Sequence, residues 1–293
     1  MTDLALRIAG APISWGVCEV PGWGWQYDPR TVLTQMREVG IAATEFGPDG
    51  FLPDDPAEKA KTLADLGLRA VGGFVPVVLH DPAHDPSAEV AEALEGFVAS
   101  GATTLVLAAA TGQEGYDDRP VLNEAGWNTL LANLDELSAL AADRGVLATI
   151  HPHVGTMVEN ADDVDRVLRG SSIGLTLDTG HLLIGGVDPV ELTLRNTGRI
   201  KHTHLKDVDA QWAAKVQAGE VSYTDAVRQG MYRPLGAGDI DLATIVTTLE
   251  HAGYDGWYVL EQDTILAGPP ADEGPVADVR GSIEHLQAIA GGV

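Results

Sequence analysis

Eight short apolar runs alternate with longer helix-compatible segments along the 293-residue chain, and this alternation constrains the fold more than any other feature. The runs are rich in β-branched residues and cover residues 9–15, 42–46, 69–75, 104–108, 147–151, 174–178, 200–205 and 257–261. Apolar residues recur at helical spacing between them, in 27–39, 57–66, 88–99, 124–144, 161–168, 188–196 and 242–252. Alternations of this kind at a spacing of about 25 to 35 residues favour a closed barrel over an open sheet, so we predict an α/β protein that forms a single (β/α)8 TIM barrel.

The chain is predicted to form one domain, residues 1–293. No linker, composition shift or internal repeat divides it, and its 45% of hydrophobic residues are enough to fill a large core. The segment at about 207–239 interrupts the regular spacing, between the seventh apolar run and the helix that follows. Long loops at the carboxyl ends of barrel strands are usually lids or substrate loops, so we predict a lid here, with a packed surface excursion as the alternative.

The charge and composition exclude several classes of partner. The formal net charge is −25, with 18 basic and 43 acidic side chains, and phosphate backbones bind mainly through Lys and Arg, so we expect no nucleic acid partner. No run approaches the roughly 18 to 20 apolar residues of a membrane helix, and the first residues lack a signal-peptide pattern, so we expect a cytoplasmic protein without a membrane partner. The single cysteine, Cys18, cannot form an internal disulfide and is expected to be structural.

Side chains that bind metals gather at the carboxyl ends of the last four predicted strands. They are His151 and His153, Asp178 and His181, His202 and His204, and Glu261. Side chains alternate along a strand and adjacent strands lie about 4.8 Å apart, so these donors can converge in the barrel mouth. Burying an unpaired carboxylate is costly, and a divalent cation compensates its charge. We therefore predict a metal site, whose nitrogen and oxygen donors suit manganese, cobalt, zinc or iron(II).

Several segments carry a resemblance to a known family. They are PISWGVCEVPGWG, TEFGPDGFLP, HPHVGTMVEN, LDTGHLLIGG, HTHLKDVD, PLGAGDID and VLEQD, and they span residues 12–263. On these segments the chain resembles the inosose dehydratases, within the xylose isomerase-like barrel superfamily. ISWGVCEVPGWG and HTHLKD are the more specific, because a carboxylate or imidazole on each of strands five to eight is also typical of epimerases, isomerases and an endonuclease branch.

The resemblance implies a hydro-lyase that converts 2-keto-myo-inositol (scyllo-inosose) to a trihydroxycyclohexane-1,2-dione in inositol catabolism. It implies His151, Asp178, His204 and Glu261 as metal ligands, and manganese or cobalt as the metal, with zinc, iron(II) and magnesium as alternatives. It further implies stimulation by glutathione and assembly into homo-oligomers. Most sugar isomerases and epimerases of the superfamily have Glu where this chain has His151, which favours a lyase over an epimerase and leaves open whether His151 or His153 is the ligand.

Dehydration beside a ketone needs a base for the neighbouring C–H proton and an acid for the departing hydroxyl. His153, His181 and Lys206 are the candidates beside the ligand Glu261, and the roles of acid and base stay open among them. Lys206 is also a candidate for binding substrate hydroxyls, or for pairing with Asp207.

Two further residues are candidates for substrate binding. Glu45 in TEFG can accept hydrogen bonds from two adjacent hydroxyls, or form a salt bridge at the barrel rim. Trp15 at the end of the first predicted strand can face the C–H side of a ring, or pack in the core. Gly236 and Gly238 in PLGAGD lack the Lys and the preceding strand of a phosphate loop, so we interpret them as turn glycines.

Three other functions compete with the dehydratase. A ketose isomerase or 3-epimerase on the same barrel is the main alternative, followed by a non-catalytic sugar-binding barrel. An abasic-site endonuclease is the third, and the acidic composition argues against it. A small polyhydroxylated ketone is therefore the predicted partner.

Overall fold

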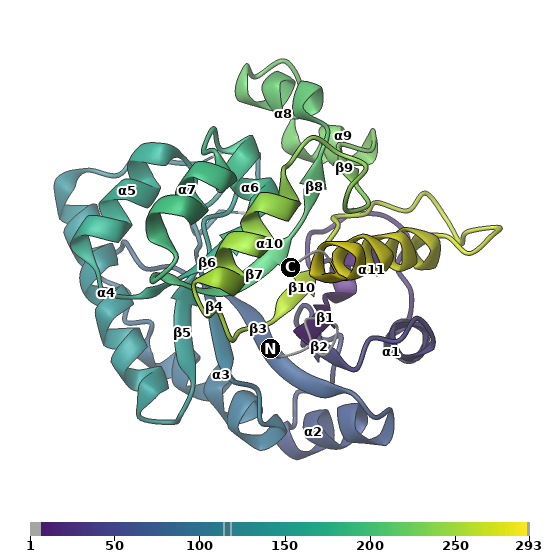
Figure 1. The fold of residues 1–293 in the computed structure, drawn as a ribbon. Coiled ribbons are helices and arrows are strands. Elements are labelled where there is room, and N and C mark those ends of the chain that lie inside the picture. Colours follow the sequence, from purple (N-terminus) through teal and green to yellow (C-terminus); the bar gives the residue numbers. More distant parts are fainter. Residues whose placement is uncertain (1–6, 114, 118, 292–293) are drawn as a thin grey trace.

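A computed structural model describes residues 7–113, 115–117 and 119–291. Within these residues, eight parallel strands close into a barrel in the order β1-β10-β7-β6-β5-β4-β3-β2 (Figure 1). The strands are β1 (Ile8–Gly10), β2 (Ala43–Glu45), β3 (Arg69–Val77), β4 (Thr104–Ala109), β5 (Leu147–Ile150), β6 (Gly174–Asp178), β7 (Ile200–Leu205) and β10 (Tyr258–Leu260). The predicted (β/α)8 TIM barrel is confirmed, and it places the carboxyl ends of all these strands around one mouth.

Helices follow the strands and form the outer ring (Figure 1). They are α1 (Pro29–Glu38), α2 (Pro56–Asp65), α3 (Ser87–Ser100), α4 (Glu124–Ala142), α5 (Ala161–Gly170), α6 (Thr179–Ile184), α7 (Pro189–Asn196), α10 (Leu242–His251) and α11 (Pro275–Gly291). Many begin at an acid or amide whose side chain accepts a backbone N–H of the first turn, as at Asp28, Asp55 and Asp188. Part of the acidic excess thus stabilises the positive ends of helices. In the described part of the chain, no helix combines the length and apolar character needed to span a bilayer.

The first strand is shorter than the predicted run 9–15. β1 ends at Gly10, and a 3-10 helix, η2 (Pro12–Trp15), follows it. Pro12 has no N–H for a strand ladder, and its restricted φ suits the start of a helix. Trp15 therefore turns into the hydrophobic core, where its indole N–H donates to Gln35 at 2.9 Å.

The segment 207–239 folds into a small unit at the barrel mouth, which we call the insertion. β8 (Asp207–Val208) pairs antiparallel with β9 (Tyr232–Arg233), and α8 (Ala210–Gln217) and α9 (Tyr223–Arg228) lie between them in the chain. In Figure 1 the two helices, drawn in green, project beyond the ring of barrel helices. The insertion shares an apolar cluster with the mouth of the barrel, formed by residues that include Val208, Tyr223 and Val227 together with Trp23, Val154 and Ile184.

Asp207 connects the two ends of the insertion. Its buried carboxylate accepts backbone N–H groups from Gly236 at 2.8 Å, Gly238 at 3.0 Å and Ile240 at 3.1 Å. Gly236 has a φ of +86°, and a Cβ on Gly238 would lie 2.3 Å from the Asp207 carboxylate. The two glycines are therefore turn residues that let the backbone approach a carboxylate.

Replacing Asp207 by Ala is expected to lower the free energy of unfolding by about 1–3 kcal/mol, because buried N–H groups lose their acceptor. We also expect limited proteolysis to cleave the insertion faster, and urea unfolding to report the loss of stability. Asp225→Ala is the matched control, since its carboxylate pairs only on the surface, with Arg228 at 2.6 Å. Equal cleavage rates in the two variants would contradict the anchoring role.

Candidate metal centre and substrate pocket

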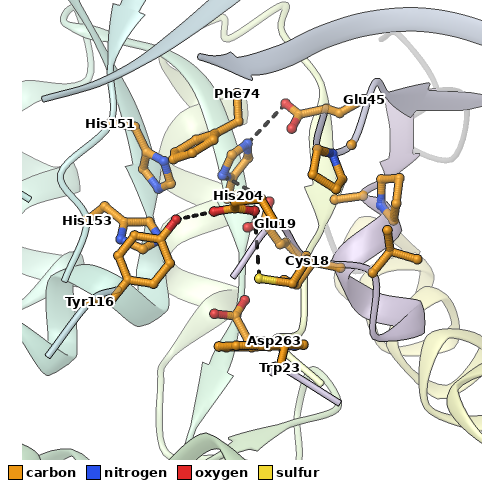
Figure 2. Close-up of a pocket in the computed structure, with 17 residues that line it drawn as sticks. Cys18, Glu19, Trp23, Glu45, Phe74, Tyr116, His151, His153, His204 and Asp263 are labelled. Carbon is orange, nitrogen blue, oxygen red and sulfur yellow. Dashed lines mark hydrogen bonds and ion pairs between the residues drawn. The ribbon is translucent and has the colours of Figure 1, made fainter. Parts of the chain in front are cut away.

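A pocket opens to solvent at the carboxyl ends of the strands (Figure 2), and its empty space, counted together with the open solvent at its mouth, is about 620 Å³. Acidic and imidazole side chains from the ends of four strands reach it, namely Glu45, His151, His153, His204, Glu261 and Asp263. Apolar side chains complete the lining, among them Ile13, Val17, Trp23 and Phe74. Convergent polar groups within an apolar wall are typical of a site for a small molecule.

The four predicted metal ligands lie together, and His151, His204 and Glu261 line this pocket. His151 Nε2 is 3.2 Å from Asp178 Oδ2, and His204 Nδ1 is 3.6 Å from the same oxygen. Glu261 Oε2 is 3.1 Å from His204 Nδ1. Ligand atoms of His151, Asp178 and His204 all lie within 4.8 Å of one another. His153 and Glu261 both lie outside this group of three, but Glu261 faces His204 Nδ1, so His151 is the histidine of the HPH segment that lies beside Asp178 and His204.

The donor set fits a divalent metal. His204 Nδ1 is buried and, among the described residues, has no hydrogen-bond partner, although it faces the carboxylates of Asp178 and Glu261. Burial alone would lower the pKa of His204, but Glu261 and Glu45 outweigh it and hold that pKa well above its usual range. The carboxylates around His204 Nδ1 therefore favour a positive charge there. A bound divalent metal would supply that charge in place of a proton on the imidazole.

The protonation of the other groups also suits metal binding. Burial lowers the pKa of His151 to about 4, which leaves its imidazole neutral with a free lone pair. Burial raises the pKa of Asp178, but the ammonium of Lys206 and the imidazole of His181 outweigh this and keep the pKa well below its ordinary value. Asp178 is thus an ionised carboxylate.

Lys206 is buried among three carboxylates. Its Nζ lies 2.9 Å from Glu261 and 3.7 Å from Asp178, and it donates a hydrogen bond to Asp263. The alternative pairing with Asp207 is wrong, because that carboxylate is directed toward the backbone of the insertion. Burial would lower the pKa of Lys206, yet the three carboxylates raise it well above its usual value, so the amine is an ammonium ion.

Asp263 is a site residue that the sequence analysis missed. It lines the pocket, and its second oxygen accepts a hydrogen bond from Tyr223 of the insertion, whose hydroxyl lies 3.1 Å from that of Tyr232. The available signal was its position two residues after Glu261, because alternate residues of an extended segment share a face. No sequence pattern pointed to the two tyrosines in this way, because the insertion lies outside the regular alternation of barrel strands and helices.

His153 and His181 form a stack beside the metal ligands. Their ring centroids are 3.6 Å apart, and the ring of Tyr116 lies 4.5 Å from that of His153. Burial holds the pKa of both imidazoles well below the ordinary value. His153 Nδ1 lies 2.7 Å from the carbonyl oxygen of Val154, to which it donates, so its Nε2 carries the lone pair. His153 lines the pocket, whereas His181 lies behind it.

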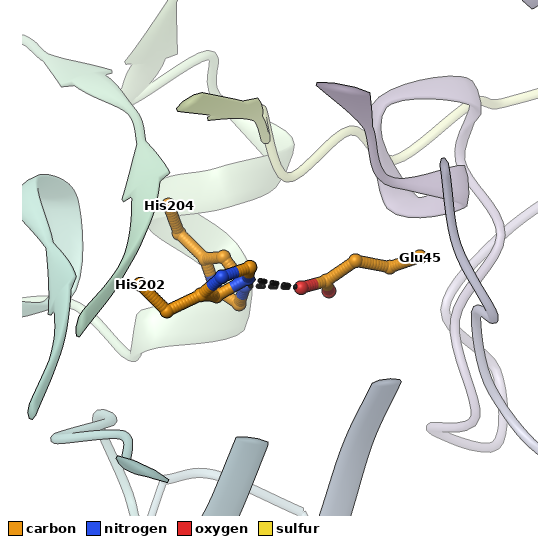
Figure 3. A group of neighbouring side chains, drawn as sticks. All are labelled: Glu45, His202 and His204. Atoms are coloured by element: carbon orange, nitrogen blue, oxygen red, sulfur yellow. Dashed lines mark hydrogen bonds and ion pairs between the residues drawn. The ribbon is translucent and has the colours of Figure 1, made fainter. Parts of the chain in front are cut away.

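Trp15 takes a position that differs from the one expected for substrate binding, whereas Glu45 reaches the pocket and is also hydrogen-bonded inside the barrel. Glu45 Oε1 accepts hydrogen bonds from His202 and His204 inside the barrel (Figure 3). Trp15 is fully buried and is not part of the pocket lining found among the described residues; Trp23 occupies that wall instead. The physical reason is the 3-10 helix after β1, which turns Trp15 away from the mouth.

Cys18 and Tyr116 both line the pocket. Glu19 lies between them, since it accepts a hydrogen bond from the Tyr116 hydroxyl and its Oε2 is 3.7 Å from Cys18 Sγ (Figure 2). Burial and the Glu19 carboxylate raise the pKa of the Cys18 thiol. The thiol is therefore protonated at neutral pH and poorly suited to act as a nucleophile.

Comparison with known proteins identifies the family of this barrel. The family model described as the xylose isomerase-like TIM barrel matches residues 33–289. The chain belongs to this family. Within the xylose isomerase-like barrels, an inosose dehydratase of Geobacillus kaustophilus (strain HTA426) is 32% identical over 283 residues, which are 90% of this chain and 90% of the relative. The rhizopine catabolism protein MocC of Rhizobium meliloti is 32% identical over 277 residues, which are 91% and 85% of the two chains.

The predicted resemblance to the inosose dehydratases is thereby confirmed. Relatives of that name at 28–32% identity over 90% of this chain or more identify this xylose isomerase-like barrel as an enzyme of the hydro-lyase class. Among solved structures, an IolI protein with a bound zinc atom superposes with a TM-score of 0.70 over 98% of both chains, at 14% identity. That likeness shows the shared fold.

Proposed function

We propose that this protein dehydrates scyllo-inosose, 2-keto-myo-inositol, to a trihydroxycyclohexane-1,2-dione in the breakdown of inositol. The inosose dehydratase relatives, which match over 90% of this chain, support the substrate. The observation that carries the chemistry is the convergence of His204, Asp178 and Glu261 on one point of the pocket, with the ammonium of Lys206 beside them.

His151, Asp178, His204 and Glu261 would hold the divalent metal. When bound, the metal supplies a Lewis acid that withdraws electron density from the ketone oxygen of the substrate. We propose manganese or cobalt, and the mixed nitrogen and oxygen donors also accommodate zinc, iron(II) and magnesium. Stimulation by glutathione stays a prediction.

His153 is the proposed base. Its Nδ1–H donates to the Val154 carbonyl, so the Nε2 lone pair is free, and burial keeps the imidazole neutral. A neutral imidazole at the pocket wall can accept the proton from the carbon next to the ketone. His181, stacked behind it, would hold the ring in place.

Asp263, paired with Lys206, is the proposed source of the proton for the leaving hydroxyl, because burial raises the pKa of the Asp263 carboxyl while the Lys206 ammonium holds it in place. The C–O bond breaks with its electron pair on oxygen, the hydroxyl takes a proton from the Lys206 and Asp263 pair, and water leaves. Asp263 lines the pocket and Lys206 donates to it, so the pair connects the buried ammonium to the substrate.

The insertion would act as the lid of this site. Tyr223 donates to Asp263 from α9, so the closed insertion supplies a direct partner to the proposed acid. Closure also excludes water, which strengthens electrostatic interactions in the pocket. A cytoplasmic location and a homo-oligomeric state stay predictions, and the net charge of −25 supports a small-molecule partner over nucleic acid.

Incubation with scyllo-inosose and manganese or cobalt is the decisive test. We expect the ultraviolet absorbance of an enolised dione to appear with time, and chelation of the metal to stop it. A ketose isomerase or 3-epimerase would instead convert free ketoses without this chromophore, which chromatography of the sugars detects. A non-catalytic sugar-binding barrel would do neither. A folded, metal-loaded protein that leaves scyllo-inosose intact would overturn the proposed function.

A further inference from the structure

A buried carboxylate connects two histidines across the interior of the barrel. Glu45 Oε1 lies 2.6 Å from His202 Nε2 and 3.0 Å from His204 Nε2 (Figure 3). The exposed fractions are 3% for Glu45, 0% for His202 and 1% for His204, so water does not supply these hydrogen bonds. Glu45 comes from β2 and both histidines from β7, and β1 and β10 separate these strands in the barrel.

The backbone at Glu45 is shaped for this reach. The register between β2 and β3 shifts between Thr44 and Glu45, where Thr44 pairs with Ala70 and Glu45 with Gly72. Irregularities of this kind redirect a side chain, and they are common next to active sites. A Cβ on Gly72 would lie 2.7 Å from the backbone oxygen of Thr104, so the irregular pairing beside Glu45 requires glycine at this position.

The contact with Glu45 decides which nitrogen of His204 can bind a metal. A carboxylate only accepts hydrogen bonds, so Nε2 of His204 must be the protonated nitrogen. In the neutral ring, Nδ1 then carries the lone pair. Nδ1 is the atom that faces Glu261 at 3.1 Å and Asp178 at 3.6 Å, on the side of the proposed metal.

We propose that Glu45 is a positioning residue of the metal centre, which holds His204 in the tautomer and orientation that present Nδ1 to the ion. His202 holds the carboxylate from a second side through its own Nε2–H. Metal-ligating histidines commonly donate their second N–H to a carboxylate, and loss of that partner costs about 10- to 100-fold in metal affinity. The inference rests on the proposed metal-dependent function, and it replaces substrate binding as the role of Glu45.

The substitutions Glu45→Ala and Glu45→Gln test the proposal through metal affinity. Calorimetric titration of the full chain with Mn²⁺ is expected to show a dissociation constant raised about 10- to 100-fold by Glu45→Ala. Glu45→Gln should have a smaller effect, because the amide oxygen still accepts the Nε2–H. One ion per chain should bind in each case. Glu250→Gln is the matched control. It removes a part-buried carboxylate that accepts a hydrogen bond from the Tyr258 hydroxyl at 2.7 Å and from none of the imidazoles. The Mn²⁺ affinity of this variant should equal that of the wild type.

A spectroscopic readout separates positioning from a general loss of packing. In zinc-loaded protein with ¹⁵N-labelled histidine, the Nε2–H resonance of His204 should be resolved in the wild type and in Glu45→Gln. In Glu45→Ala it should be lost to exchange with solvent. If Glu45→Ala does not fold, the affinity and the resonance of Glu45→Gln, which keeps the shape of the side chain, still decide the question.

Two results would overturn the positioning role. Unchanged Mn²⁺ affinity with a raised KM would show that Glu45 binds substrate instead. Two ions per wild-type chain and one in the Glu45 variants would make Glu45 a ligand of a second metal, together with His202 and His204. If the expected affinities are found but scyllo-inosose is not dehydrated, the proposed substrate fails and the role of Glu45 stands.

Discussion

Replacing Glu261 by Gln is expected to abolish metal retention and to lower kcat/KM for scyllo-inosose by roughly 10³-fold. Oε2 of Glu261 lies 3.1 Å from His204 Nδ1, and Oε1 lies 2.9 Å from Lys206 Nζ, so this side chain contacts both the metal position and the buried ammonium. The amide removes a negative charge where two positive groups are held, and its NH₂ cannot ligate a cation. Elemental analysis after gel filtration and the dione absorbance measure the two effects.

Glu273→Gln is the control for this change. Glu273 lies on the surface and pairs with Arg280 at 2.9 Å, so the substitution removes the same charge far from the pocket. We expect its metal content and turnover to match the wild type, because exposed ion pairs contribute little. A Glu261→Gln protein that retains one equivalent of metal would contradict the assignment of Glu261 as a ligand.

Replacing His153 by Gln is expected to lower kcat by about 10²- to 10⁴-fold and to leave the metal content unchanged. Gln has no group that can accept the C–H proton at neutral pH, and His153 lies outside the cluster of His151, Asp178 and His204. Turnover of metal-loaded protein measures the loss, and exchange of the substrate C–H with deuterium from D₂O reports the proton-transfer step alone. Both rates should fall together.

His84→Gln controls for the loss of an imidazole. His84 is on the surface, 2.8 Å from Glu89, and its removal should change neither rate. If His153→Gln loses metal in proportion to activity, His153 is a ligand rather than the base. The same pair of variants therefore answers which of the two histidines of the HPH segment belongs to the metal.

The barrel fold and the convergence of the predicted metal ligands could be predicted from the sequence, because both follow from short-range patterns. Each strand and helix has its own apolar period, and strands of a parallel barrel end at one rim. His151, Asp178, His204 and Glu261 stand at such ends, so strand order alone brings them together. The first strand was misjudged because Pro12 starts a 3-10 helix within an apolar run.

The amino-acid sequence by itself determined the barrel, the family and the group of metal donors at its mouth. Only the tertiary structure decided that Glu45 reaches across to His204, that Asp263 and Tyr223 contact one another near Lys206, and that Trp23 lines the pocket in place of Trp15. Glu45 and His204 are separated by 159 positions, and Tyr223 and Asp263 by 40. Strand periodicity specifies which face a residue takes, whereas the partner on that face depends on barrel closure and on how the insertion packs over the mouth.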